Sequence, residues 1–283
     1  MKVAVCFYGL VGGGNNFQKS HRWMNVEDSE SFCAIGHRHY KEHIFDKNDE
    51  IDVFVHTWST DRQEEIQELY NPVSAVYEQQ IAFPNRPKYQ HKQTDRKVWG
   101  GYSRWYSTKS VVDLKKQYEK KHNFTYDCVM LTRFDIAFMA PLQFDQYNMN
   151  NFYASGQKNK QHEHMTSKKY VADWWFFSNS KNIDNFAALY DEIDRYGRLD
   201  LHGYQHRMAR TRINDIGLSN RLQFVLNRDD DNKLIRELLS NPQCKNRGNW
   251  WSLYGPTGLY APDSALPTSE LNPGKRRHPK WKD

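Results

Sequence analysis

The sequence predicts an α/β fold in which a mostly parallel central sheet is flanked by helices. Strands expected at residues 3–8 and 51–58 alternate with helices, and a long helix and further strands follow them. Such alternation is typical of a largely parallel sheet covered by helices. Residues 126–139 form an apolar run rich in strand-forming residues, as expected for a strand buried on both faces. The 283 residues are enough to bury a full core as one large domain or two small ones.

The elements of the first half follow from periodicity and turn residues. The strand at 3–8 leads into a Gly-rich loop, residues 9–16, in which many positions can take a positive φ. The strand at 51–58 is apolar and ends in polar residues, as a parallel strand does at a site. The other elements expected here are helices near 31–45 and 61–70, a strand at 73–80, a surface loop at 84–98 and a helix at 99–121 with an apolar face.

The second half continues the alternation and ends irregularly. The strand at 126–139 is stopped by Pro141, and a polar loop is expected at 156–169. The other expected elements are strands at 152–155, 171–178 and 222–226, and helices at 182–196 with Ser180 as N-cap, at 204–216, and at 232–239. From residue 241 onward Pro, Gly and Asn dominate, so we predict a domain at 1–240 and an irregular extension with a basic tail at 241–283.

Composition narrows the function classes. Hydrophobic residues make up 38% of the chain, and no apolar run approaches the roughly 18 residues that a membrane span needs. The four cysteines are widely spaced without a CxxC pair, which indicates a reducing compartment and no structural zinc. We therefore expect a cytoplasmic protein. The net charge of +6 fits a protein that binds anionic small molecules, and it also fits nucleic acid or membrane surfaces.

The apolar run at 126–139 carries Arg133 and Asp135 near its end. A buried strand rarely holds such residues unless they pair or meet a ligand. On a strand, side chains two positions apart point to the same side, so this carboxylate and guanidinium suit a divalent metal and a diphosphate. That combination indicates nucleotide-sugar chemistry; the alternative is a structural ion pair. A rival acidic triplet at 229–231 follows another apolar strand, but there it would cap the helix expected at 232–239.

Polar residues near the ends of the first strands are candidates for donor binding. In an open α/β sheet the ligand lies at the carboxyl ends of the strands. Tyr8, Gly9 and Leu10 end the first strand and could contact a nucleotide through aromatic stacking and close backbone approach. His56 and Thr57 end the second strand, where a satisfied polar pair is the alternative interpretation. Ser107 on the long helix comes within reach of a nucleotide if that helix borders the site.

An ordered series of motifs resembles a group of glycosyltransferases found in bacterial polysaccharide clusters and in large viruses and phages. The series comprises Asp52-Val-Phe-Val-His-Thr-Trp58, Tyr106-Ser107, Tyr126-Asp127, Arg133-Phe-Asp135 and Asp173-Trp-Trp-Phe-Phe-Ser178, and the resemblance spans residues 1–228. It implies a GT-A-like, Rossmann-type sandwich that uses nucleotide sugars. Asp135 would then bind Mn²⁺ or Mg²⁺, and Arg133 would pair with Asp135, the phosphates or the sugar. Asp173 would be the catalytic, acceptor-side carboxylate.

The sequence thus favours a metal-assisted glycosyltransferase that moves a sugar from a nucleoside-diphosphate donor to a glycan or another hydroxyl acceptor. In a virus the corresponding location would be the host cytoplasm. One alternative is a nucleic-acid-binding protein, suggested by the net charge, the aromatic content and the basic stretch at 207–212. A second alternative is a catalytically inactive sugar-binding protein on the same fold.

Overall fold

The computed structural model describes residues 1–11, 31–88, 90, 92–157, 170–196, 204–228 and 230–235. Within these ranges the strands form one sheet in the order β3-β2-β1-β4-β7-β6-β8-β9-β5. The strands are β1 (Lys2–Gly9), β2 (Glu50–Thr57), β3 (Ser74–Tyr77), β4 (Cys128–Thr132), β5 (Ile136–Phe138), β6 (Phe152–Gln157), β7 (Trp175–Ser178), β8 (Leu222–Arg228) and β9 (Asn232–Leu234).

The sheet is mostly parallel, as predicted. Strands β3, β2, β1 and β4 all run in one direction, and β8 runs parallel to both β6 and β9. Strand β7 is antiparallel to both of its neighbours, β4 and β6, and β5 is antiparallel to β9. The parallel set is the part of the sheet whose carboxyl ends meet at one edge.

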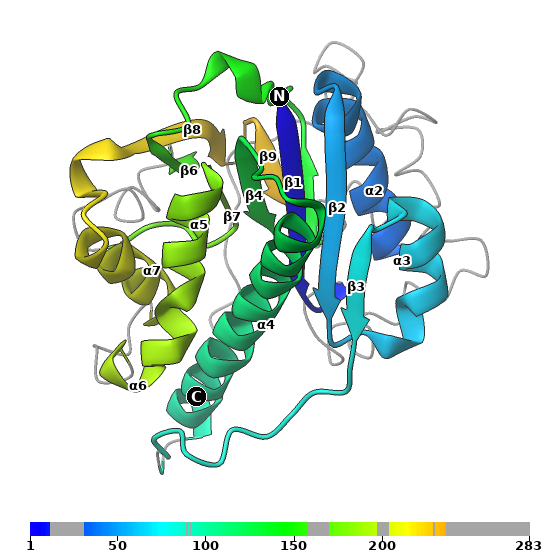
Figure 1. Cartoon of the computed structure of the whole chain (residues 1–283). Coiled ribbons are helices and arrows are strands. Elements are labelled where there is room, and N and C mark those ends of the chain that lie inside the picture. The colour runs from blue at the N-terminus through cyan, green and yellow to red at the C-terminus, as the bar shows by residue number, and fades with distance from the viewer. Residues whose placement is uncertain are drawn as a thin grey trace, which may run out of the picture.

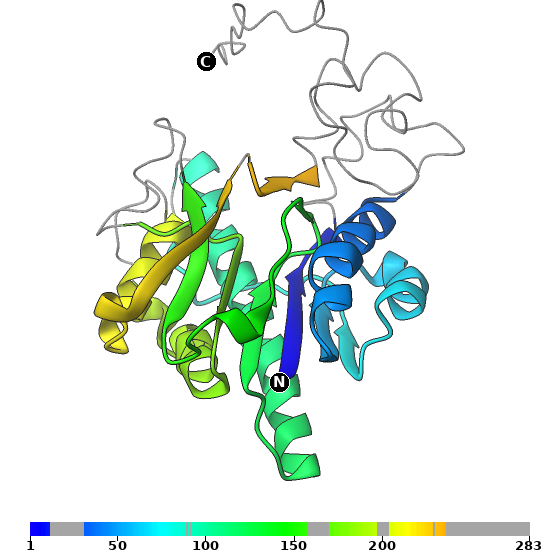
Figure 2. The same ribbon diagram turned by 90° about the horizontal axis from the view of Figure 1, so that it is seen from above.

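Helices cover both faces of this sheet (Figures 1 and 2). Helices α2 and α3 lie on one side of β1, and α5 and α7 lie on the other, with α4 packed on β1 and β2. The helices are α2 (Phe32–His43), α3 (Gln63–Tyr70), α4 (Lys92–His122), α5 (Ser180–Ala187), α6 (Ile193–Tyr196) and α7 (Tyr204–Asp215). Short 3-10 helices are Phe45–Lys47, Thr60–Arg62, Phe144–Gln146, Ala188–Glu192 and Ser219–Arg221.

Two hydrophobic clusters, one on each face, explain why β1 is a continuous apolar run. Val3, Val5 and Phe7 belong to the cluster that includes α2 and α3. Ala4 and Cys6, which alternate with them, belong to the cluster that includes α4, α5 and α7. Since successive side chains point to opposite faces of a sheet, a strand covered on both faces must be apolar at every position.

Local capping sets several helix ends. Helix α2 begins after Ser31, whose hydroxyl accepts the N–H of Ala34 at 3.0 Å. Helix α3 ends at Asn71, which adopts the left-handed conformation with φ 42°. The expected cap at Ser180 is wrong by one position, because the Asn179 side chain accepts the N–H of Asn182 at 2.9 Å.

The single strand predicted at 126–139 is in fact two strands. Strand β4 ends at Thr132, Arg133 to Asp135 form a turn, and β5 begins at Ile136. Although the two strands are close in sequence, β5 pairs with β9 at the far end of the sheet order. The strand breaks where the charged side chains pair with each other, so the polar pair ends β4 at the sheet edge.

The helix predicted at 232–239 is also wrong at its start, Asn232–Leu234. Residues Asn232–Leu234 form β9, in which Leu234 pairs with Ile136 of β5. The carboxylate of Asp231 accepts the N–H of Asn227 at 2.7 Å and so closes the turn before β9 instead of capping a helix. Pairing with a distant strand thus outweighed the local helix pattern. Asp229 lies outside the described residues.

The other helices and strands differ from the prediction mainly in where they begin and end. Helix α4 begins at Lys92, inside the predicted loop, and the helix predicted at 182–196 is divided into α5, a 3-10 segment and α6. Strand β7 begins at Trp175, so Asp173 precedes it. The loop predicted at 156–169 and the boundary at residue 240 lie mostly or wholly outside the described residues. In the described ranges, no helix combines the length and the hydrophobicity needed to cross a bilayer.

Candidate functional site

The carboxyl ends of β1, β2 and β4 meet at one edge of the sheet. Gly9 is in register with Thr57, and Phe7 is in register with Thr132. Charged and polar side chains from β1, α4, the turn after β4, the segment before β7 and α7 gather around this edge. We call the following set the edge cluster: Tyr8, Arg104, Arg133, Asp135, Asp173 and His206.

The predicted pairing of Arg133 with Asp135 is present. Arg133 donates from Nε and Nη2 to the two carboxylate oxygens of Asp135 at 2.8 and 2.7 Å. Asp135 is 1% exposed, whereas the side chain of Arg133 remains 22% exposed. The carboxylate is therefore enclosed, and Arg133 is the more exposed member of the pair.

Helix α2 holds this turn in place. The hydroxyl of Tyr40 donates to the carbonyl oxygen of Arg133 at 2.6 Å and also bonds the hydroxyl of Thr132 at 2.5 Å. Gly36, one helical turn earlier, lies so close to the carbonyl of Phe134 that a Cβ atom there would collide with it. The absence of a side chain at Gly36 thus lets α2 approach the turn.

Asp173 lies at the centre of the second half of the edge cluster. Its carboxylate oxygens are 3.2 Å from Nε of Arg104 and 3.0 Å from Nδ1 of His206. The hydroxyl of Tyr8 donates to the backbone carbonyl of Asp173 at 3.0 Å and accepts from Nη2 of Arg104 at 3.1 Å. Burial by itself would raise the pKa of Asp173, but His206, Arg104 and Arg133 together hold the pKa well below its usual value.

The depressed pKa of Asp173 predicts a pH-dependent contribution to stability. Because the folded-state pKa lies below the unfolded value of about 3.9, the contribution is complete above pH ~4 and is lost as the pH falls further. We expect Asp173→Asn to lower the free energy of unfolding by about 3 kcal/mol at pH 7, and by less at pH 3. Urea unfolding at both pH values measures this. Asp61→Asn, at a side chain 72% exposed, is the control, and an equal deficit for Asp173→Asn at both pH values would contradict the assignment.

Hydrogen bonds inside the protein connect His56, Ser107 and Gly9 at the ends of β1 and β2. The donor contacts predicted for these residues stay predictions. Nδ1 of His56 lies 2.7 Å from the hydroxyl of Ser107, which also accepts the N–H of Gly9 at 2.8 Å. Nε2 of His56 lies 2.7 Å from the carboxylate of Glu78. Burial lowers the pKa of His56, and Glu78 opposes this in part, so a neutral imidazole fits the site. Gly9 has a φ of 91°, which a residue with a side chain would adopt only with strain.

The remaining predicted donor residues are positioned as follows. The hydroxyl of Thr57 accepts the N–H of Ser59 at 3.1 Å, and both residues are buried. Leu10 is half-buried directly after β1. The ring of Tyr8 is 2% exposed, with the guanidinium of Arg104 5.2 Å from its centroid. In this arrangement Tyr8 supports Arg104, and the donor contacts assigned to these three residues stay predictions.

Sequence reasoning missed Arg104 and His206. Arg104 lies on the buried stripe of α4, because it is followed at helical spacing by Thr108, Val111 and Lys115, all of which are buried. A charged residue on an apolar helix face was therefore a usable signal. For His206 no comparable signal exists, since α7 has several polar and basic residues on all sides.

Asp135 is the kind of ligand that a divalent cation prefers, but it is a single protein ligand. Carboxylate oxygens are the ligands that Mg²⁺ and Mn²⁺ prefer, and Asp135 supplies one such group. In the described parts of the chain, no three His, Cys, Asp or Glu side chains gather to hold a metal. Both oxygens of Asp135 already accept from Arg133, and the Asp135 side chain is 1% exposed. A cation could therefore bind there only by displacing Arg133, and it would take its other ligands from donor phosphates and water.

Comparisons with known proteins add little to this geometry. No protein-family model matches the chain, and no curated protein matches it. Among solved structures, the chain is similar to the apo form of the glycosyltransferase GlyE of Streptococcus pneumoniae TIGR4, with a TM-score of 0.42 and 10% sequence identity. The match covers 80% of this chain and 45% of that one, so this chain spans less than half of the length of GlyE. A similarity of this size assigns no residue of the site.

Proposed function

We propose that the protein transfers a glycosyl group from a nucleoside-diphosphate sugar to a hydroxyl acceptor at the edge cluster. The observation that carries this proposal is the gathering of Arg104 and Arg133 with the carboxylates of Asp135 and Asp173 at the carboxyl ends of parallel strands. Ligands of open α/β sheets bind at that end. Guanidinium groups recognise phosphate oxygens in a fixed fork geometry, so the cluster suits a diphosphate leaving group.

Arg133 is the proposed contact for the donor diphosphate. Two of its nitrogens bond Asp135, which fixes the plane of the guanidinium, and 22% of the Arg133 side chain is exposed. If Mn²⁺ or Mg²⁺ took the place of Arg133 on Asp135, it would neutralise the charge that develops on the departing nucleotide. Gly9 and Leu10, at the end of β1, would line the donor on the other side.

His206 is the proposed acceptor of the proton, and Asp173 acts through it. A carboxylate that is buried and strongly stabilised in its ionised form is a weak base, whereas imidazole is the commonest general base in enzymes. Nδ1 of His206 faces Asp173 and is buried, while 24% of the His206 side chain is exposed. In the proposed step, Nε2 takes the proton of the acceptor hydroxyl. The acceptor oxygen then bonds the anomeric carbon, and the bond from that carbon to the phosphate oxygen breaks.

A thermal-shift panel tests donor binding. UDP-, GDP-, CMP- and dTDP-sugars are each added with and without Mn²⁺ to the wild type, Arg133→Gln and Asp135→Asn. We expect one nucleotide to raise the melting temperature of the wild type. Arg133→Gln should bind it about 10–100-fold more weakly, because hydrogen bonds to a charged group are lost.

The same panel separates the roles of the two residues. A shift that needs Mn²⁺ and is lost in Asp135→Asn would support the metal contact, and a metal-independent shift would remove it from the proposal. Lys116→Gln, at an exposed position of α4, is the control for a general loss of positive charge. No shift with any nucleotide would contradict the transferase function.

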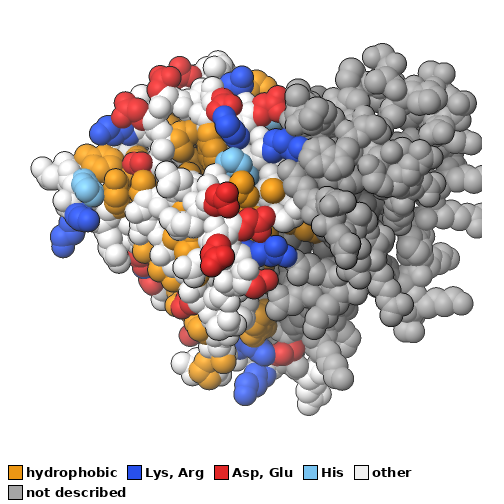
Figure 3. Space-filling view, turned by 90° about the vertical axis from the view of Figure 1, so that its right-hand side faces the viewer, with side chains coloured by type: hydrophobic (Ala, Val, Ile, Leu, Met, Phe, Trp, Pro, Cys, Tyr) orange, Lys and Arg blue, Asp and Glu red, His pale blue; other side chains and the backbone are white. Residues whose placement is uncertain are grey.

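Nucleic-acid binding has less support in the structure. On the face over α2 and α3, Lys and Arg side chains are interspersed with Asp and Glu (Figure 3). In the basic stretch of α7, Arg212 is 7% exposed, and it bonds the carbonyl of Asn185 and the carboxylate of Glu192. Arg212 is therefore occupied within the protein. Steep salt dependence of oligonucleotide binding would favour this alternative, and nucleotide-sugar binding without turnover would favour an inactive sugar-binding protein.

A further inference from the structure

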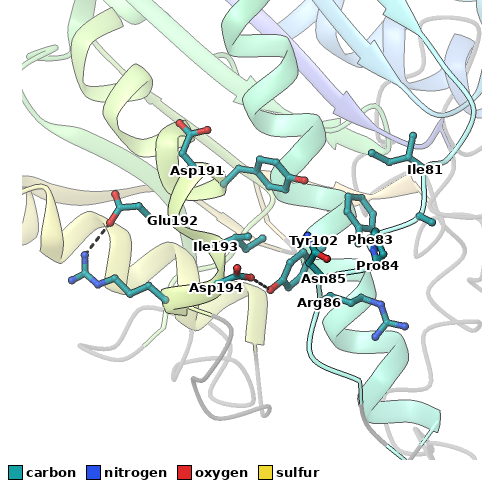
Figure 4. Close-up of a pocket in the computed structure, with 13 residues that line it drawn as sticks. Ile81, Phe83, Pro84, Asn85, Arg86, Tyr102, Asp191, Glu192, Ile193 and Asp194 are labelled. Atoms are coloured by element: carbon teal, nitrogen blue, oxygen red, sulfur yellow. Dashed lines mark hydrogen bonds and ion pairs between the residues drawn. The ribbon is translucent and has the colours of Figure 1, made fainter.

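A cavity lies apart from the edge cluster, between α4 and the segment that contains α6. Its volume is about 470 Å³, within the range of small-molecule sites. Figure 4 shows the side chains that enter it from three segments: residues 81–86, Tyr102 of α4, and residues 190–195. The walls combine aromatic rings with carboxylates, and nothing described so far uses them.

The aromatic wall is rigid. Phe83 and Tyr102 are 7% and 4% exposed, and their ring centroids are 6.0 Å apart. The hydroxyl of Tyr102 donates to a carboxylate oxygen of Asp194 at 2.6 Å, which fixes both side chains. Tyr190, on the opposite side, is half-buried and packs edge-on against Tyr106. A flat ligand entering here meets ring surfaces that are already ordered, so little side-chain entropy is lost on binding.

The charges of the cavity nearly cancel. Glu192 is paired with Arg212 at 2.7 Å and with Arg195 at 3.1 Å, and Arg86 is paired with Asp95. The Asp191 side chain is 57% exposed, and one of its carboxylate oxygens lies 3.8 Å from Nζ of Lys109. The cavity therefore offers carboxylate oxygens as hydrogen-bond acceptors without a strong negative field, which favours a neutral ligand over a cation or an anion.

We propose that this cavity binds a sugar ring of the acceptor glycan, an inference that rests on the proposed transferase function. A pyranose has an apolar face of C–H groups that packs on an aromatic ring and an edge of hydroxyl groups that donate to acceptors such as Asp191 and Asp194. A neutral polyhydroxylated ring meets both features of the wall.

The position of the cavity fits an acceptor subsite. Tyr106 is in contact with Tyr190 and Phe83 of the cavity, and also with His56 at the carboxyl end of β2, with centroid distances of 5.4, 6.1 and 5.6 Å. Gln80, directly before the cavity segment, donates to Ser103 of α4 at 2.6 Å. One ring and one short segment thus connect the cavity to the strand ends where the donor is proposed to bind.

Saturation-transfer NMR with neutral disaccharides tests the proposal on the full chain. The panel is maltose, cellobiose, lactose and N,N′-diacetylchitobiose, each at about 10 mM, a concentration that detects millimolar affinity. We expect at least one to bind the wild type and Tyr190→Phe, and to bind Tyr190→Ala about 5–10-fold more weakly, because the ring surface is lost. Asp191→Asn should also weaken the binding of the same sugar. Tyr77→Ala, a half-buried tyrosine of β3 outside the cavity, is the control and should bind normally.

Two outcomes would overturn the acceptor subsite. One is that no sugar binds although a nucleotide sugar shifts the melting temperature, and the other is that binding is equal in Tyr190→Ala and the wild type. If a sugar binds through Tyr190 but no nucleotide sugar binds, the sugar site stands and the transferase function is contradicted. Tyr190→Ala must also retain the nucleotide-induced shift, which shows that the variant is folded.

Discussion

Replacing His206 by alanine is expected to slow glycosyl transfer by about 10²–10⁴-fold, the usual contribution of a general base. Donor binding should be unchanged, because the proposed phosphate contact is Arg133. The carboxylate of Asp173 lies 3.2 Å from Nε of Arg104 and 3.0 Å from Nδ1 of His206, at ion-pair distance but without hydrogen-bond geometry. In the proposed step this carboxylate stabilises the imidazolium that forms when Nε2 of His206 takes a proton.

Added imidazole provides a readout that a merely structural role would not give. We expect it to restore part of the rate of His206→Ala by occupying the vacated volume beside Asp173. His206→Gln, which fills that volume without a basic nitrogen, should be equally slow and should not respond. Product formation is measured at saturating donor. Equal rates in the wild type and His206→Ala would exclude His206 as the base and return that role to Asp173.

Replacing Lys115 by methionine is expected to lower the free energy of unfolding by about 3–5 kcal/mol. The Lys115 side chain is fully buried. Its ammonium group bonds Glu119 at 2.9 Å, Asp184 at 2.6 Å and the hydroxyl of Ser180 at 2.5 Å. Removing the only cation of this group leaves two carboxylates without their partner, which costs more than the lost hydrogen bonds. Urea unfolding at pH 7 measures the loss.

Two further variants distinguish charge from packing at this position. Lys116→Met, the exposed neighbour on α4, should change stability by less than about 0.5 kcal/mol. Burial already raises the pKa of Asp184 although Lys115 opposes it. Adding Glu119→Gln and Asp184→Asn to Lys115→Met should therefore recover much of the loss, since the uncompensated charges are removed. A triple variant less stable than Lys115→Met would show that the shape of the side chains matters more than their charge.

The parts of the fold that could be predicted are those whose signal is local. Strand β1 is a continuous apolar run, because helices cover both faces of the sheet there, and β2 is buried from Val53 to its end. The break between β4 and β5 could not be predicted, since β5 leaves β4 to pair with β9, a strand that lies far away in the sequence. The local pattern at β9 predicts a helix, because the strand that β9 pairs with, β5, lies far away in the sequence.

The same distinction holds for the candidate site. The sequence predicts that Gly9 and His56 lie at the ends of β1 and β2, as they do, and their donor contacts stay predictions. The two-residue spacing of Arg133 and Asp135 indicated that they could pair. The contacts of Asp173 could not be predicted. They come from α4 and α7, whose positions over the sheet edge depend on packing that no short stretch of sequence encodes.

The turn that holds Asp135 has a consequence for biosynthesis. The carbonyl of Asp135 accepts the N–H of Ile235 at 2.9 Å, and the N–H of Met139 bonds the carbonyl of Asp231 at 2.8 Å. A growing polypeptide therefore has its first four parallel strands long before the segment that encloses Asp135 is translated. Contacts between residues this distant form slowly, because a long loop must close first. If the protein has the proposed function, donor recognition should accordingly be acquired late, after β9 joins the sheet, and a nascent chain arrested before that point would hold its Arg133–Asp135 turn open to water.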